Sequence, residues 1–91
     1  MTTDIPQTDA IIWPGELLQE ELEARGISQR ELAARTGRPA QAINEIIRGR
    51  KALTAETALD LERVLGIPAY LWVGLEGQYR LALARQRAKS A

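Results

Sequence analysis

The sequence predicts an all-α fold, with five helices in one small domain. Apolar residues recur at the three- and four-residue spacing of helices, and no stretch shows the alternation of a half-buried strand. Glycines and prolines interrupt this pattern at short intervals and divide the chain into five segments. The 91 residues suffice for one domain, and 45% of them are hydrophobic, so a core can form. That core must consist mostly of Leu, Ile and Ala, because only 4% of the residues are aromatic.

The first two helices are predicted over residues 15–25 and 28–36. Gly26 ends the first, because glycine readily takes the left-handed conformation that closes a helix. The second begins at a capping box, in which the Ser28 hydroxyl accepts a hydrogen bond from a free backbone N–H and the Glu31 side chain reaches back to the helix start.

The remaining three helices are marked by proline, threonine and glycine. The third is predicted over residues 39–48, with Pro39 in its first turn, where the missing N–H costs nothing. Thr54 caps the fourth helix, Gly66 ends it, and Pro68 opens the fifth. The residues expected to face inward are Leu18, Leu22, Ile43, Ile46, Ile47, Ala58, Leu61, Leu65, Leu71, Trp72, Leu75, Tyr79 and Leu83.

The folded domain is expected to span residues 13–86, between two flexible ends. Residues 1–12 form an N-terminal arm and residues 87–91 a basic tail, since the ends of a domain are rarely fixed in place. The arm has no Lys or Arg and does not resemble a targeting segment, and no apolar run is long enough to span a membrane. These features predict a cytoplasmic protein.

The absence of two residue types excludes whole classes of site. The sequence has no Cys, which rules out disulfides, thiolate metal ligands and cysteine nucleophiles. It has no His, which rules out His-based triads and imidazole metal sites. Glu16, Glu20 and Glu23 share one face of the first helix, and without His they are expected to be solvated. We therefore expect no enzyme activity, no metal and no cofactor.

The net charge of zero hides an uneven distribution of charge along the chain. Residues 1–24 carry −6 and residues 52–79 carry −3, whereas residues 25–51 carry +5 and residues 80–91 carry +4. A local basic face, rather than the total charge, is what binds a nucleic-acid backbone. The basic window is a weak indication of such binding, because a segment of this length also reaches such a charge by chance.

The second and third helices have the arrangement of a helix-turn-helix. Both are short, and the turn between them contains Gly37, which can adopt a left-handed conformation. The small Ala33 and Ala34 allow the two helices to pack closely. In DNA-binding proteins such a pair places its second helix in the major groove. The same pair also occurs in plain helical bundles, and the geometry alone favours neither interpretation.

Longer pieces of the sequence match a known family over the stretch from Trp13 to about Leu83. They are Pro14-Gly15-Glu16, Leu18 to Gly26, Ser28-Gln29-Arg30-Glu31-Leu32-Ala33, Ile43-Asn44-Glu45-Ile46-Ile47-Arg48-Gly49, Leu53-Thr54-Ala55-Glu56-Thr57-Ala58-Leu59, and Leu65-Gly66 followed by Trp72, Leu75, Tyr79 and Leu81. With these pieces the chain resembles the HigA-type antitoxins of the Xre/Cro-like helix-turn-helix family. The resemblance implies a five-helix lambda-repressor-like bundle with a helix-turn-helix.

The same resemblance implies a function and a set of partners. It implies a sequence-specific DNA-binding antitoxin that represses its own operon and neutralises a small RNA-cleaving toxin of the HigB/RelE type. The partners would be double-stranded DNA at an operator in its own promoter, a second copy in a homodimer, and a small basic toxin. Two alternatives stay open: a stand-alone Xre-family regulator without a toxin, and the DNA-binding N-terminal domain of a longer regulator.

The chain departs from the family pattern in two places. Arg38 and Pro39 replace the Val-Ser type of start to the recognition helix, so the operator sequence does not follow from the resemblance. Further departures lie in the last helix, where Asn, Gln, a non-glycine residue and Asp are replaced by Gly74, Glu76, Gly77 and Arg80. This second region is distal to the DNA-reading helices, so it bears on the dimer or partner surface.

The candidate base-reading residues lie in the third helix. At the start of a recognition helix, Gln41 can pair bidentately with adenine and Ala42 can contact a thymine methyl group. For Gln41 the alternative is a solvated helix residue, and the resemblance favours base contact. Asn44 and Glu45 lie further along the helix and are either base-facing or solvent-facing.

The candidate phosphate-binding residues flank that helix. Gln29 and Arg30 begin the second helix, where backbone amides and side chains commonly meet a phosphate. Arg38 reads a guanine or holds a phosphate, and the phosphate role is favoured. The strongest phosphate candidates follow the third helix and are Arg48, Arg50 and Lys51. The complete candidate set is Gln29, Arg30, Arg38, Pro39, Gln41, Ala42, Asn44, Glu45, Arg48, Arg50 and Lys51.

Overall fold

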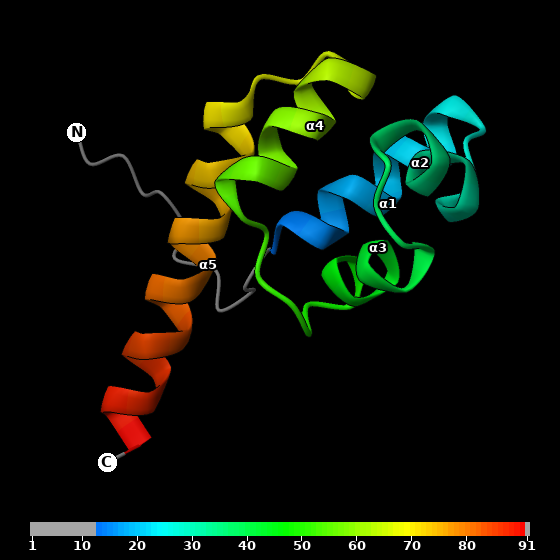
Figure 1. Cartoon of the computed structure of the whole chain (residues 1–91). Helices are drawn as coiled ribbons and strands as arrows, with labels where there is room; N and C mark the ends of the chain where they lie inside the picture. The colour runs from blue at the N-terminus through cyan, green and yellow to red at the C-terminus, as the bar shows by residue number, and fades with distance from the viewer. Residues whose placement is uncertain (1–12, 91) are drawn as a thin grey trace.

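The described residues, 13–90, form five α-helices and no β-strand (Figure 1). This computed structural model confirms the all-α fold class. In chain order the helices are α1 (Pro14–Arg25), α2 (Gln29–Thr36), α3 (Ala40–Ile47), α4 (Ala55–Leu65) and α5 (Ala69–Ser90). Residues 1–12 and 91, which include the expected N-terminal arm, lie outside the described residues.

Hydrogen bonds at the starts of α2 and α4 follow the capping pattern expected from the sequence. The Ser28 hydroxyl accepts from the Glu31 N–H at 3.0 Å. The Thr54 hydroxyl accepts from the Thr57 N–H at 3.2 Å. The reciprocal half of the expected capping box does not form, because the Glu31 carboxylate pairs instead with Arg35, one turn later in α2.

The ends of α3 and α5 differ from the sequence expectation. α3 is one residue shorter at each end, so Pro39 and Arg48 are its caps. Pro39 takes an extended conformation with ψ 142°, which lies outside the helical region. α5 continues to Ser90, through residues 87–90, where the sequence suggested the start of a flexible tail. Its C-terminal half projects beyond the other helices (Figure 1).

One apolar core lies between the helices. α3 packs against α1 and α2, and α5 packs against α1 and α4. At the centre is Trp72 of α5, whose side chain is completely buried. The buried apolar residues are Leu18, Leu22, Leu32, Ala33, Ile43, Ile46, Ile47, Leu53, Ala58, Leu61, Leu65 and Trp72. The expected inward residues of α1, α3 and α4 are all among them.

The inward face of α5 differs from the expectation at Leu71. Its side chain is 42% exposed, so the prediction that it faces inward is wrong. Successive helix residues point about 100° apart. Because α5 packs with the face centred near Trp72 and Tyr79, Leu71 is turned to the side. Leu75 and Leu83 are half-buried, as is Tyr79.

α1 and α3 meet backbone to backbone at Gly15. A Cβ atom there would lie 2.1 Å from the Ile46 carbonyl oxygen and 2.6 Å from the Ile47 Cα. No side chain larger than hydrogen fits this gap without moving one helix. Gly15 therefore lets α1 support the C-terminal half of α3 directly.

Candidate nucleic-acid interface

A tight three-residue turn joins α2 to α3. Gly37 takes a left-handed conformation with φ 74°, and its N–H donates to the Ala33 carbonyl at 2.9 Å. The N–H of Arg38 donates to the same carbonyl at 3.1 Å. The Thr36 hydroxyl closes the end of α2 by donating to the Leu32 carbonyl at 2.8 Å. These two helices and their turn form the helix-turn-helix expected from the sequence.

One face of α3 is buried in the core, and the other faces the solvent. Its three isoleucines lie in the core, which fixes the rotation of the helix. Gln41 lies on the outward side and is exposed. The other candidate base-reading residues are half-buried: Ala42, Asn44 and Glu45. The outward side of α3 therefore carries polar groups that can reach base edges in a major groove.

A side-chain hydrogen bond joins the two helices at this surface. The Asn44 Nδ2 of α3 donates to the Gln29 Oε1 of α2 at 3.1 Å. A side-chain amide carries both donors and an acceptor. This hydrogen bond therefore leaves the Gln29 side-chain N–H groups and the Asn44 side-chain oxygen available to a further partner. Sequence reasoning selected both residues separately and missed the bond, because 15 residues separate them in the chain.

The segment after α3 presents three cations. Arg48, Arg50 and Lys51 are exposed, and none of them forms an ion pair with a carboxylate of residues 13–90. The N–H groups of Arg50 and Lys51 both donate to the Glu45 carbonyl, at 2.9 and 3.2 Å. These two hydrogen bonds to one carbonyl oxygen fold the segment back onto the end of α3. We call residues 48–53 the basic loop.

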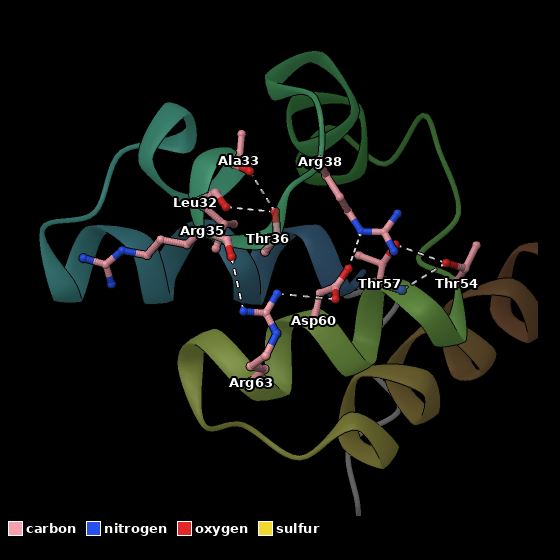
Figure 2. A network of polar contacts seen from close by, with 9 residues as sticks. All are labelled: Leu32, Ala33, Arg35, Thr36, Arg38, Thr54, Thr57, Asp60 and Arg63. Carbon is pink, nitrogen blue, oxygen red and sulfur yellow. Dashed lines mark hydrogen bonds and ion pairs between the residues drawn. The ribbon is translucent and has the colours of Figure 1, made fainter.

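Arg38 differs from the other candidate cations because it has an internal partner. Its Nε donates to Asp60 Oδ2 of α4 at 2.7 Å, and the two side chains are about 30% exposed. Asp60 Oδ1 lies 3.6 Å from Arg63 Nη2, and Arg63 Nη1 donates to the Arg35 carbonyl at 3.3 Å. Figure 2 shows how these contacts tie the end of α2 and the turn to α4. Sequence reasoning did not identify Asp60.

An aromatic pair covers the C-terminal end of α3. The Trp13 Nε1 donates to the Ile47 carbonyl at 2.7 Å. The Trp13 ring lies against the Tyr79 ring of α5, with centroids 6.4 Å apart and planes tilted by 47°. Gly49 passes beneath both rings, and a Cβ there would lie 3.5 Å from Trp13 and 3.6 Å from the Tyr79 hydroxyl. The start of the basic loop is therefore packed between the first and last elements of the domain.

Glu76 of α5 contacts the other end of the basic loop. Its Oε1 accepts a hydrogen bond from the Leu53 N–H at 3.2 Å, and its Oε2 accepts one from the Arg80 Nε. The Glu76 side chain is only 13% exposed. The Arg80 guanidinium also lies over the Tyr79 ring, 5.0 Å from its centroid. Positions 76 and 80 depart from the family pattern, but nothing in the sequence indicates that they contact the loop.

Residues 13–90 carry neither a metal-binding cluster nor a membrane-spanning helix. In this part of the chain no group of three or more carboxylates is placed to hold a metal ion, and this includes Glu16, Glu20 and Glu23. None of its helices combines the length and the apolar character needed to cross a membrane.

A model of the helix-turn-helix family matches residues 18–72, from the middle of α1 to the first turn of α5. The chain belongs to the helix-turn-helix family. The matched range includes the whole candidate DNA-binding set. Among known relatives of this helix-turn-helix protein, virulence-associated protein I of Dichelobacter nodosus is 40% identical over 80 residues, which are 87% of this chain and 74% of the relative.

Solved structures place this helix-turn-helix protein closer to one group within the family. An addiction module antidote protein of the HigA family from Coxiella burnetii is 31% identical, with a TM-score of 0.82 over 88% of each chain. The Pseudomonas aeruginosa antitoxin HigA, solved with the higBA promoter, is 32% identical, with a TM-score of 0.84 over 89% of each chain. The resemblance to HigA-type antitoxins is confirmed.

Proposed function

We propose that this chain is a sequence-specific DNA-binding antitoxin and the transcriptional autorepressor of a type II toxin-antitoxin operon. The observation that carries the proposal is the match over 89% of each chain to an antitoxin solved with its promoter. The helix-turn-helix supports it independently, as do the basic-loop cations, which form no ion pair within residues 13–90. In this role the protein is not an enzyme, and it acts in the cytoplasm, where the operator is.

In this proposal α3 is the recognition helix and lies in the major groove of the operator. Gln41 reads an adenine, and Ala42 contacts a thymine methyl group. Asn44 and Glu45 lie one turn further along α3, and Pro39 comes close to the DNA at its start. Phosphates are held at the start of α2 by Gln29 and Arg30, near the turn by Arg38, and at the basic loop by Arg48, Arg50 and Lys51.

The proposed DNA-binding unit is a homodimer. A two-fold dimer places two recognition helices about 34 Å apart, one turn of the double helix. Among residues 13–90 most of the large exposed apolar side chains lie on α5, and Tyr70, Val73 and Leu81 share one face of that helix. An apolar face of this kind is typical of an interaction surface. We place the second copy there, so light scattering should give twice 10.1 kDa, and Leu81→Glu should give the monomer.

The second proposed partner is a small basic toxin of the HigB/RelE type that cleaves RNA. The support is the similarity to antitoxins and antidote proteins over most of the chain. A short open reading frame for a basic protein beside the gene, whose product this chain binds and inhibits, would be the expected finding. Without such a neighbour, the stand-alone regulator is the better description. A stop codon further downstream would instead favour the N-terminal domain of a longer regulator.

The test is fluorescence anisotropy with a labelled duplex from the DNA upstream of the gene. We expect selective binding that scrambled competitor does not remove. For about six phosphate contacts per dimer, affinity should fall about a thousandfold between 50 and 200 mM salt. Gln41→Ala should weaken operator binding and leave binding to scrambled DNA unchanged. The matched control is Gln78→Ala, which removes the same amide from an exposed position of α5. Equal binding to operator and scrambled DNA would contradict autorepression by this chain.

A further inference from the structure

The basic loop is held in its middle and at its end by hydrogen bonds to its backbone. In its middle, the Glu45 carbonyl of α3 accepts from the N–H groups of Arg50 and Lys51. At its end, the N–H of Leu53 donates to the Glu76 carboxylate of α5 at 3.2 Å. Only Ala52 lies between these two anchors. The backbone that carries the loop cations is therefore fixed from two different helices.

Glu76 is itself held in place on both oxygens. One oxygen accepts from Leu53 and the other from Arg80, whose guanidinium rests on the Tyr79 ring. With 13% of its side chain exposed, Glu76 is among the more deeply placed carboxylates of this part of the chain. A carboxylate in such a position has few alternative conformations, so the anchor that it offers the loop is rigid.

We propose that Glu76 is a positioning residue for DNA binding, which holds the basic loop in the conformation that meets the DNA backbone. This inference rests on the proposed DNA binding by the helix-turn-helix. Cations on a loop that is already ordered lose less conformational entropy when they contact phosphates, and several contacts can form at once. Glu76 does not touch the DNA in this arrangement. Its effect passes through the Leu53 N–H to Arg48, Arg50 and Lys51.

If Glu76 acts by positioning the loop, removing it weakens DNA binding. If it acts only through its charge, removing it strengthens DNA binding. Removing a negative charge near three cations strengthens binding to a polyanion if charge alone matters. Glu76→Gln and Glu76→Ala remove the same charge, but only the glutamine keeps a side-chain oxygen for the Leu53 N–H. The glutamine has one acceptor oxygen for two donors, the Leu53 N–H and the Arg80 Nε, so slower hydrogen exchange at the Leu53 amide in Glu76→Gln than in Glu76→Ala identifies the Leu53 bond as the one retained. Glu56→Gln and Glu56→Ala provide the same pair at an exposed position of α4.

The experiment measures anisotropy on the operator duplex at several salt concentrations, at a temperature where melting curves show all variants folded. We expect Glu76→Ala to bind about fivefold more weakly than Glu76→Gln. We also expect its salt slope to be smaller by about one unit per chain, because loop contacts to phosphate are lost. A contribution to stability alone would lower the melting temperature without changing this slope. Hydrogen exchange at the Leu53 amide should be faster in Glu76→Ala.

Several outcomes would overturn the inference. Equal affinities and equal salt slopes for the two Glu76 variants would show that the hydrogen bond does not act on DNA binding. An equally large difference between the two Glu56 variants would do the same. If the wild type binds scrambled DNA as tightly as the operator, autorepression fails, and the Glu76 comparison on that DNA still decides the role of the loop. If it binds no DNA, both proposals fail.

Discussion

The Nε of Arg38 donates to the Oδ2 of Asp60 across 2.7 Å, and this ion pair joins the turn before α3 to the middle of α4. It engages only the guanidinium nitrogen nearest the main chain. A guanidinium has further N–H donors on its two terminal nitrogens, and these suit a second anion, such as a phosphate. Arg38 can thus fix the turn and contact a phosphate at the same time, through donors held apart in a planar fork.

The coupling between Arg38 and Asp60 can be measured in a double-mutant cycle. We expect Arg38→Gln and Asp60→Asn each to lower the free energy of unfolding, with a coupling of about 0.5–1 kcal/mol, because the pair is only partly shielded from water. Urea denaturation of the two single variants and the double variant gives this quantity. Strictly additive effects would show that the ion pair contributes nothing to stability.

Gly15→Ala should be one of the most damaging small substitutions in the chain. The added methyl group meets the backbone of Ile46 and Ile47, so α1 and α3 must separate. Overpacking of this kind costs about 1–3 kcal/mol in the free energy of unfolding. Denaturation with urea measures the loss, and an unchanged midpoint would contradict the close contact between the two helices.

Gly74→Ala and Gly77→Ala should have the opposite effect. Both residues lie inside α5, and nothing within residues 13–90 lies within 4 Å of a Cβ at either position. In the monomer, replacing a glycine inside a helix by alanine should therefore raise the free energy of unfolding by roughly 0.5–1 kcal/mol for each. Thermal melts at low protein concentration test this. A lower melting temperature would mean that a partner or second copy covers this face closely.

Arg50→Gln should weaken DNA binding without changing its selectivity. A phosphate contact carries no sequence information, so affinity for operator and scrambled DNA should fall by the same factor. The salt slope should fall by about one unit per chain. Arg85→Gln removes the same charge from an exposed position of α5 and is the control. A loss confined to the operator would indicate that Arg50 reads a base.

Local features of the fold could be predicted because they depend on residues close together in the chain. Ser28 and Thr54 cap their helices, and Gly37 makes the turn, because each acts on backbone groups within four residues. Leu71 was assigned to the wrong face, since α5 carries apolar residues on more than one side. Periodicity alone cannot say which side meets the core.

Contacts between distant segments could not be predicted from the sequence. Asp60 is 22 residues from Arg38, and Glu76 is 23 residues from Leu53. Neither acidic residue belongs to a motif that indicates its partner. The candidate DNA-binding set could be chosen because it follows the helix-turn-helix, but the residues that hold it in place come from α4 and α5.

The two tryptophans make the protein its own optical reporter. Trp72 sits in the apolar core, so its emission should stay blue-shifted until the fold opens. Trp13 is hydrogen-bonded to the end of α3 and lies beside Tyr79, next to the basic loop. In a Trp72→Phe variant the remaining tryptophan signal comes from Trp13 alone. Unlabelled DNA arriving at the loop then becomes visible as a change in that fluorescence, with no dye on either molecule.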